Sequence, residues 1–283
     1  KKKIAINGFG RIGRLTLRAF FEKNTDDFEV TAINDLGTVE SNVHLYKFDS
    51  VHGKCKEDIT LNQESVTIKN QNIKFFSEPD PLNLPWKELG IDLVIESTGF
   101  FTNKDSAQKH ISAGAKKVLI SAPAKDPDFT VVFGVNDTEL NDNHKVISNA
   151  SCTTNCLAPI AYLIENTLGI ESGYMTTVHS VTGDQNTIDT IHKDLRRARN
   201  SLISIIPTST GAARAVGDVL PQLNGKIDGS AIRVPTSNVS LVDFKFLAKR
   251  NTNEEELKNI FKDAENGALK FILETTSEPL VSP

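Results

Sequence analysis

The stretch that most constrains the fold is a glycine-rich segment near the start of the chain. An apolar strand pattern at residues 3–6 runs directly into Asn-Gly-Phe-Gly-Arg-Ile-Gly at residues 7–13. A helical pattern follows, and a second strand at residues 29–33 ends at Asn34-Asp35. One face of that helix carries Ile12, Leu15, Thr16, Ala19 and Phe20. A Rossmann unit has these parts in this order: a strand, the G-x-G-x-x-G motif, a helix, and a second strand that ends in an acid. The segment therefore predicts an α/β fold with a doubly wound parallel sheet.

Each glycine of this motif has a physical task. Gly8 permits the tight turn, Gly10 lets the backbone approach a pyrophosphate, and Gly13 lets the helix pack on the strand. The pyrophosphate would lie at the N-terminus of the helix. Asp35 follows about 20 residues later, where an acid hydrogen-bonds the adenosine ribose and repels a 2′-phosphate, so it predicts NAD over NADP. The alternative is a glycine turn that holds no ligand.

Two later strands bring further residues to the same edge of the predicted sheet. The strand at residues 91–97 leads into Thr98 and Gly99, and the strand at residues 117–120 leads into Ser121. Ligands of doubly wound sheets lie beyond the carboxyl ends of the strands, so these three residues are candidates for the cofactor crevice. Turn chemistry alone would also place Ser, Thr and Gly there, and both interpretations stay open.

The remaining patterns predict two domains with a boundary near Ala150. The first, residues 1–150, is the nucleotide-binding domain, and the second, residues 151–283, carries an alternating strand typical of an antiparallel sheet. Further predicted elements are a helix at residues 104–112, strands at 130–133, 146–147, 172–178 and 240–248, and helices at 212–220 and 253–265.

A cysteine lies at a predicted strand-to-helix junction, in Ser-Asn-Ala-Ser-Cys-Thr-Thr-Asn-Cys at residues 148–156. Cys152 falls in the first helical turn, where free backbone N–H groups and the helix dipole stabilise a thiolate. The alternative is a small buried hydrophobe, the usual fate of a free cysteine, and it stays open. For Cys156 that alternative is favoured. A zinc site at this pair is disfavoured because no second pair with ligand spacing follows, and we expect no metal.

A reactive cysteine needs a base, and His179 at the end of a predicted strand is the candidate. A lone histidine at a strand end is more often a satisfied core residue. The long segment at residues 185–206 holds a basic cluster, which is more often a solvated face than a site. Hydroxyls and a glycine at residues 207–213 precede a predicted helix, an arrangement suited to an anion.

The composition narrows the classes of function. At 283 residues, 39% hydrophobic and 24% charged, the chain is an ordinary globular one with room for two domains. A formal net charge of −4 indicates no nucleic-acid partner. Three cysteines suit a reducing compartment, and neither a signal peptide nor a membrane-spanning apolar run is present, so we expect a cytoplasmic protein with no membrane partner.

Together these parts suit oxidation of an aldehyde through a thioester, with phosphate nearby, and the chain resembles phosphorylating glyceraldehyde-3-phosphate dehydrogenase nearly end to end. The segments that carry the resemblance are residues 7–13, 148–156, 177–179, 194–199, 207–213 and 233–236. The resemblance implies a Rossmann domain plus an α+β catalytic domain with a mixed, largely antiparallel sheet. It also implies a homotetramer acting in glycolysis with NAD, glyceraldehyde 3-phosphate and inorganic phosphate, and 1,3-bisphosphoglycerate as the product.

The resemblance also assigns roles to matching residues. Cys152 would attack the aldehyde and His179 would take up the proton. Thr182 and Arg233 match residues that hold the substrate's phosphate, with Arg197 as a supporter. Residues matching the site for incoming phosphate are Ser151, Thr153, Thr210 and Gly211. Residues matching cofactor contacts are Arg11, Ile12, Asp35, Thr98 and Ser121.

Four departures from the family pattern stand out. Pro79 replaces a basic residue over the adenine, Val181 replaces an aromatic, and Thr190-Ile191 stands where NAD-specific members have Leu-Pro. Family chains also continue beyond Pro283, so we expect the catalytic domain to be C-terminally incomplete and poorly active as it stands. The alternative functions are erythrose-4-phosphate dehydrogenase and a non-catalytic NAD-binding interaction protein.

Overall fold

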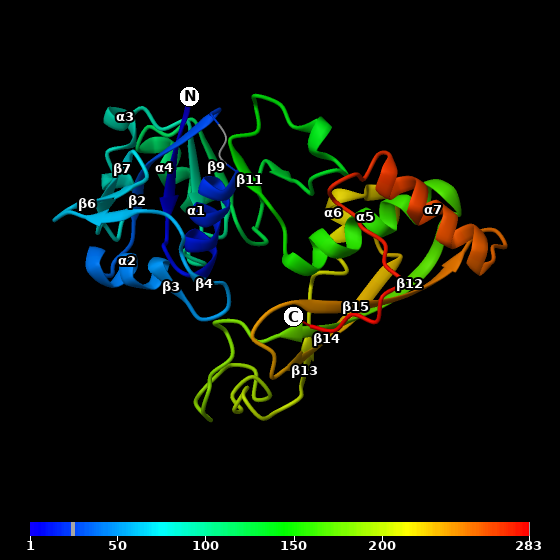
Figure 1. The fold of residues 1–283 in the computed structure, drawn as a ribbon. Helices are drawn as coiled ribbons and strands as arrows, with labels where there is room; N and C mark the ends of the chain where they lie inside the picture. The colour runs from blue at the N-terminus through cyan, green and yellow to red at the C-terminus, as the bar shows by residue number, and fades with distance from the viewer. Residues whose placement is uncertain (24–25, 283) are drawn as a thin grey trace. The chain divides into compact units, whose positions relative to one another are not determined.

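The computed structural model describes residues 1–23 and 26–282. The chain forms two compact units (Figure 1). The first unit comprises Lys1–Thr130 and Leu140–Ala150, and the second comprises Val131–Glu139 and Ser151–Pro283.

A large sheet, nine-stranded within the described residues, forms the centre of the first unit. Its strand order is β10-β11-β9-β8-β1-β2-β7-β6-β5. The pairs from β10 to β7 are parallel, whereas β6 and β5 are added antiparallel at one edge. The strands are β1 Lys2–Asn7, β2 Phe28–Asn34, β5 Ile59–Leu61, β6 Ser65–Ile68, β7 Gln71–Phe76, β8 Leu93–Glu96, β9 Lys117–Ile120, β10 Phe129–Thr130 and β11 Val146–Ser148, and a separate antiparallel pair is formed by β3 Phe48–Asp49 and β4 Gly53–Lys54.

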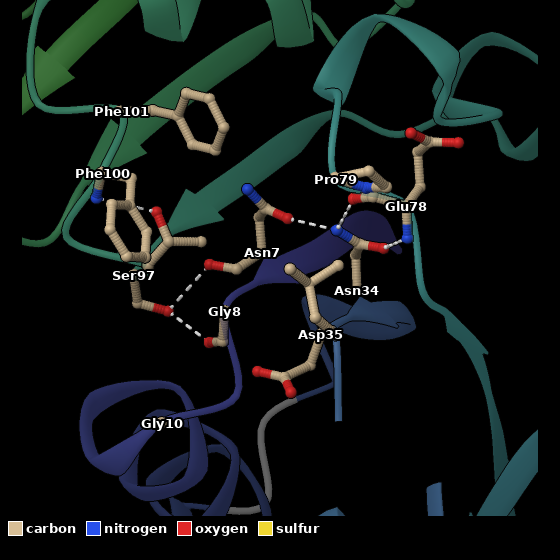
Figure 2. A pocket seen from close by; sticks show the side chains of 12 residues that line it. Asn7, Gly8, Gly10, Asn34, Asp35, Glu78, Pro79, Ser97, Phe100 and Phe101 are labelled. Carbon is tan, nitrogen blue, oxygen red and sulfur yellow. Dashed lines mark hydrogen bonds between the residues drawn. The ribbon is translucent and has the colours of Figure 1, made fainter. Parts of the chain in front are cut away.

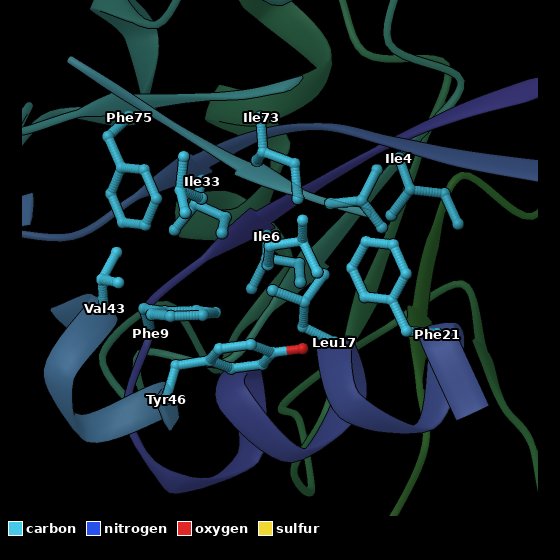
Figure 3. Packing of buried hydrophobic residues seen from close by; sticks show 13 residues of the cluster. Ile4, Ile6, Phe9, Leu17, Phe21, Ile33, Val43, Tyr46, Ile73 and Phe75 are labelled. Carbon is cyan, nitrogen blue, oxygen red and sulfur yellow. The ribbon is translucent and has the colours of Figure 1, made fainter. Parts of the chain in front are cut away.

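Helices cover both faces of this sheet, which is why β1 is buried on both of its sides. The helices are α1 Arg11–Lys23, α2 Val39–Lys47, η1 Pro81–Asn83, α3 Trp86–Leu89 and α4 Lys104–Ser112. Ile4 and Ile6 of β1 pack with Leu17 of α1 and Tyr46 of α2 in one core cluster (Figure 3). Ala5, between them, faces the opposite cluster, which contains Trp86 and Ala107 of α3 and α4. The predicted doubly wound sheet is confirmed.

The second unit is built around a mixed sheet, four-stranded within its described part. Its order is β13-β14-β12-β15, with β12 parallel to β14 and the two outer pairs antiparallel. Its elements are η2 Asp137–Glu139, α5 Cys152–Thr167, β12 Ile170–Ser180, β13 Ile206–Ser209, α6 Val216–Val219, η3 Pro221–Leu223, β14 Ile227–Val234, β15 Ser240–Ala248 and α7 Glu254–Asn266. The mixed, largely antiparallel sheet expected for this part of the chain is confirmed.

Two local predictions were wrong. The helix predicted at residues 212–220 is only the four-residue α6, preceded by turns, and the strand predicted at 130–133 is β10, which ends at Thr130. The buried residues of α1 are Gly13, Leu17, Arg18 and Phe21, while Ile12 is exposed and Phe20 packs partly buried against the core cluster. The cause is the packing at Gly13, where an added Cβ would lie 2.2 Å from the carbonyl oxygen of Gly8, so this glycine faces the strand turn and sets the rotation of the helix.

Candidate active site

The glycine motif borders a pocket of about 390 Å³ in the first unit, at the carboxyl ends of the parallel strands (Figure 2). Gly8 has φ +89°, and an added Cβ would lie 2.6 Å from the backbone nitrogen of Thr98. An added Cβ at Gly10 would meet nothing within 4 Å, so the backbone there is open to a ligand. Twelve residues line the pocket: Asn7, Gly8, Gly10, Asn34, Asp35, Leu36, Glu78, Pro79, Ser97, Thr98, Phe100 and Phe101.

Asp35 is held by three donors at the edge of this pocket. Its Oδ2 accepts the backbone N–H of Phe9 at 2.8 Å. Its Oδ1 accepts the backbone N–H of Gly37 at 2.8 Å and Nδ2 of Asn42 at 3.1 Å. Since a carboxylate can accept about four hydrogen bonds, one position stays available for a ribose hydroxyl. The open glycine backbone and this carboxylate fit a dinucleotide.

Four of the predicted cofactor residues line the pocket: Gly8, Gly10, Asp35 and Thr98. The others lie outside its lining. The guanidinium of Arg11 is paired with Asp49 at 2.9 Å, and the Ile12 side chain is 51% exposed. Gly13 packs against Gly8, Gly99 has φ +78° with open space around it, and the N–H of Ser121 donates to the carbonyl of Glu96 at 2.9 Å.

Sequence reasoning missed the two buried amides of the pocket, Asn7 and Asn34, and the aromatic residues Phe100 and Phe101. A signal for the amides was present, because each is the last residue of a strand at the edge where the ligand was expected. The aromatic side chains follow a strand by several residues, and nothing local indicates which way they point.

The second unit contains the predicted cysteine at a helix start. Cys152 is the first residue of α5, and the N-cap residue Ser151 accepts the backbone N–H of Thr154 at 2.9 Å. Cys152 is exposed, so the buried-hydrophobe alternative is wrong for it. Cys156 is exposed too, contrary to the interpretation favoured for it. Desolvation by the surrounding protein, and then the charge of Cys152, raise the pKa of the Cys156 thiol, so the two thiols differ chemically.

His179 lies against the sulfur of Cys152. Its Nε2 is 3.1 Å from Sγ, and its ring is buried at the end of β12. The hydrogen bond with His179 is the main cause that lowers the pKa of the Cys152 thiol. Desolvation of the thiolate opposes the shift, while the charge of His179 and the N–H and hydroxyl of Thr153 reinforce it. The histidine is therefore placed to exchange a proton with the sulfur.

Arg233 stands on the other side of the imidazole. It is paired in register with His179 across the parallel strands β14 and β12. Its Nη1 lies 2.5 Å from Nδ1 of His179 and donates to the carbonyl of Ser180 at 3.0 Å. Burial, and then the charge of Arg197, lower the pKa of Arg233. The buried Nε has no partner among the described residues, so this cation keeps a free donor.

Arg197 is committed to the loop that carries it. Its Nε donates to Thr208 at 3.0 Å, its Nη2 donates to the carbonyl of Ser209 at 3.2 Å, and its Nη1 is paired with Asp184. These bonds join the segment after His179 to β13. Thr182 is also engaged, since its hydroxyl donates to the side-chain oxygen of Gln185 at 3.3 Å.

Several of the residues matched to the incoming phosphate already form hydrogen bonds with their near neighbours in the sequence. The hydroxyl of Ser151 caps α5, as described above, and Thr153 is buried. The hydroxyl of Thr210 accepts the N–H of Ala212 at 3.1 Å, and the carbonyl of Gly211 accepts the N–H of Ala215 at 2.9 Å. Turns over residues 212–215, followed by the short α6, replace the predicted helix after Gly211.

Neither a metal-binding cluster nor a membrane-spanning helix is found within the described residues. Within residues 1–23 and 26–282, no group of three or more His, Cys, Asp or Glu side chains is placed to hold a metal ion. Across the same described ranges, no helix has the length and apolar character needed to span a bilayer.

Comparison with known proteins gives consistent matches along the chain. A family model described as glyceraldehyde 3-phosphate dehydrogenase, NAD binding domain, matches residues 2–104, and one described as glyceraldehyde 3-phosphate dehydrogenase, C-terminal domain, matches residues 151–283. A glyceraldehyde-3-phosphate dehydrogenase of Xanthobacter flavus is 55% identical over 280 residues, which cover 99% of this chain and 84% of the relative. The enzyme of Zymomonas mobilis is 54% identical over 282 residues, with the same coverage of 99% and 84%. Glyceraldehyde-3-phosphate dehydrogenase 1 of Bacillus cereus is 51% identical over 281 residues, again covering 99% and 84%.

Proposed function

The chain belongs to the glyceraldehyde-3-phosphate dehydrogenase family, and we propose that Cys152 is the nucleophile of its reaction and His179 the base and acid. The family's activity is the NAD-dependent oxidation of glyceraldehyde 3-phosphate, with inorganic phosphate, through a cysteine thioester. The observation that carries the residue assignment is the 3.1 Å contact between Sγ of Cys152 and Nε2 of His179, together with the lowered pKa of the thiol.

The chemistry proposed for these side chains is a two-stage transfer. The thiolate of Cys152 attacks the aldehyde carbon, and a proton from His179 gives the hydroxyl of a thiohemiacetal. The imidazole then takes the hydroxyl proton as the carbon is oxidised to the thioester. NAD, when bound, supplies the hydride acceptor. Inorganic phosphate then attacks the thioester carbonyl, which releases the thiolate and gives the acyl phosphate 1,3-bisphosphoglycerate.

Arg233 is proposed to hold the phosphate group of the substrate, with Thr182 beside it. The free Nε of the buried guanidinium and its place next to His179 support this role. Arg197 is proposed to support the site through its charge and by anchoring the loop, because three of its N–H donors, one on each nitrogen, bond to Thr208, Asp184 and Ser209. Ser151, Thr153, Thr210 and Gly211 are proposed for the incoming phosphate on the family resemblance.

The cofactor site is proposed at the pocket of the first unit. Gly8, Gly10, Thr98 and Asp35 would hold NAD through the backbone turn and the ribose, with Arg11, Ile12, Gly13, Gly99 and Ser121 assigned on the resemblance. We further propose that residues 1–150 are the NAD-binding domain and residues 151–283 the catalytic domain.

A homotetramer in the cytoplasm is proposed as the working form. The segment between β12 and β13 supports self-association, because it exposes several large apolar side chains that a monomer would leave in water. Their exposures are Ile188 68%, Ile191 98%, Leu195 81%, Leu202 58%, Ile203 81% and Ile205 71%. Sedimentation equilibrium tests this state directly.

Alkylation by iodoacetate tests the pair of Cys152 and His179. Labelling of Cys152 should follow a pKa below that of an ordinary thiol, and His179→Asn should shift the rate profile to higher pH, with a fall of about tenfold at pH 7. Cys156→Ser is the matched control and should label at the wild-type rate. Equal rates in wild type and His179→Asn would remove the histidine from the mechanism. NADH formation that requires phosphate and prefers glyceraldehyde 3-phosphate to erythrose 4-phosphate tests the substrate.

A further inference from the structure

A chain of buried polar side chains runs across the ends of the parallel strands beneath the cofactor pocket. Asn34, Asn7 and Glu96 are the last residues of the neighbouring strands β2, β1 and β8, with exposures of 5%, 1% and 2%. His110 of α4 and Trp86 of α3 extend the chain into the core, and both are 0% exposed. Figure 2 shows the pocket end, where Asn7, Asn34 and the backbone of Glu78 are joined by hydrogen bonds.

Glu96 is the centre of this chain and has no acceptor position to spare. Its Oε1 accepts the backbone N–H of Thr98 at 2.8 Å and the hydroxyl of Thr98 at 2.5 Å. Its Oε2 accepts Nδ2 of Asn7 at 2.6 Å and Nε2 of His110 at 2.9 Å. Four donors converge on two oxygens, so all acceptor positions of this buried side chain are taken.

Trp86 determines which nitrogen of His110 carries the proton. The indole N–H can only donate, and it lies 2.9 Å from Nδ1 of His110. Nδ1 therefore accepts, and Nε2 carries the hydrogen that is donated to Glu96. His110 thus accepts a hydrogen bond from Trp86 and donates one to Glu96.

Glu96 also sets the direction of the amides that line the pocket. Because Nδ2 of Asn7 points at Glu96, its Oδ1 faces Asn34 and accepts Nδ2 of that residue at 2.7 Å. Nδ2 of Asn34 also donates to the carbonyl of Glu78 at 2.9 Å, and its Oδ1 accepts the N–H of Glu78 at 2.9 Å. If the hydrogen bond between Glu96 and Asn7 were reversed, the amides of Asn7 and Asn34 would have to reverse as well. The change would then reach Glu78, which precedes Pro79 in the pocket wall.

We propose that Glu96 is a positioning residue for the cofactor, which holds Thr98 on one side of the pocket and the Asn7, Asn34 and Glu78 chain on the other. This proposal rests on the assignment of the pocket to NAD. Glu96 itself contacts no part of the ligand in this proposal. It acts by presenting four lone pairs that keep both pocket walls in the binding geometry before the cofactor arrives.

The substitution Glu96→Gln tests this directly, because it keeps the shape and replaces one acceptor by an NH₂ group. With the NH₂ group toward Thr98, the backbone N–H of Thr98 loses its acceptor. With the NH₂ group toward Asn7 and His110, there are two possibilities. Either the donor of Asn7 or that of His110 loses its acceptor, or the amides of Asn7 and Asn34 both reverse and the hydrogen bonds to Glu78 are lost. Either way the Kd for NAD, measured by calorimetry, should rise roughly tenfold, since a buried donor is left unsatisfied.

Four further measurements separate positioning from general destabilisation. Trp86→Phe removes the N–H donor together with part of the buried ring, and it should raise the Kd about two- to threefold. Val66→Ala, a buried position of the core away from the pocket, should lower the melting temperature with the Kd for NAD unchanged. Alkylation of Cys152 without NAD should be the same in Glu96→Gln as in wild type. Because Trp86 is the single tryptophan, its emission maximum reports whether the chain is disturbed.

The outcomes are distinct. If Glu96→Gln folds and binds NAD with the wild-type Kd, the positioning role is wrong. If Val66→Ala weakens NAD binding as much as Glu96→Gln at equal loss of stability, the effect is general and the role is also wrong. If Asp35→Asn leaves the Kd for NAD unchanged, it is the assignment of the pocket to NAD that fails. Should Glu96→Gln not fold, Trp86→Phe decides, and a wild-type Kd in that variant overturns the proposal.

Discussion

The floor of the cofactor pocket and the surroundings of Cys152 use polar groups in opposite ways. At the floor, Glu96 is buried and all of its acceptor positions are taken. Around the cysteine, the sulfur is exposed and the buried Nε of Arg233 has no partner among the described residues. A site that only binds gains from groups that are already oriented, because little ordering remains to be done on binding. A site that handles a proton and anions needs groups that are still free to bond.

The largest effect that this contrast predicts is at Cys152. The substitution Cys152→Ser should reduce NADH formation by on the order of a thousandfold or more, because an alcohol at this position is a far weaker nucleophile than a thiolate. The melting temperature and the Kd for NAD should stay near wild-type values, since residue 152 is exposed and a serine hydroxyl can keep the hydrogen bond to buried His179. Cys156→Ser serves as the control and should keep its activity. A large loss of stability in Cys152→Ser would contradict the proposed difference between the two sites.

A smaller effect is expected at Asp35, whose carboxylate accepts three N–H donors. The substitution Asp35→Asn turns an NH₂ group toward at least one of these donors and should weaken NAD binding roughly tenfold. The preference for NAD over NADP should narrow, because the charge that repels a 2′-phosphate is lost. Titrations with both cofactors measure the two effects. Unchanged discrimination would mean that another group excludes NADP.

The contribution of Asp49 to stability should depend on pH, which extends the contrast to another carboxylate of the first unit. Burial would raise its pKa, but the N–H groups of His52 and Val51 and the guanidinium of Arg11 outweigh burial and lower the pKa from 3.8 to about 2. A lowered pKa means stability that is present above about pH 4 and is lost as the pH falls toward 2. Asp49→Asn should therefore cost roughly 1–2 kcal/mol in the free energy of unfolding at pH 7, and much less at pH 2, where the carboxyl is already partly protonated in the folded protein. Denaturant titrations at the two pH values measure this, and an equal cost at both would contradict it.

The smallest effect is expected at Ser151, which serves as the helix cap and is also proposed as a phosphate contact. The substitution Ser151→Ala should cost about 1 kcal/mol of stability because the N–H of Thr154 loses its acceptor. If the hydroxyl also binds the incoming phosphate, the KM for phosphate should rise about threefold or more. A loss of stability with an unchanged KM for phosphate would leave the residue as a cap only.

Much of the architecture could be predicted from local patterns. The glycine motif at Gly8, Gly10 and Gly13 predicted the parallel sheet because its turn has few alternatives. The helix predicted at residues 104–112 and the strands at 117–120 and 240–248 have the predicted bounds. The helix predicted at residues 212–220 failed because a run of small apolar residues satisfies helical periodicity without requiring it, and the chain instead forms turns before Val216.

For the candidate site, the kinds of residue could be predicted but not their mutual positions. Cys152 at a helix start is a local property, since the cap at Ser151 and the free N–H groups lie within one turn. The φ of +55° at Ala150, just before this turn, has no sequence signal, because alanine rarely adopts that conformation. The pairing of Arg233 with His179 depends on the register of two strands that are distant in the sequence.

The sequence by itself determined the Rossmann unit, an acid at the end of its second strand and a cysteine with helix-end chemistry, because each depends on neighbours a few residues apart. Only the tertiary structure decided that Nε2 of His179 lies 3.1 Å from the sulfur and that Asn7, Asn34, Glu96, His110 and Trp86 form one directed chain. Hydrogen bonds act over about 3 Å. Contacts between strands and helices far apart in the chain therefore form only when sheet order and register bring those atoms together.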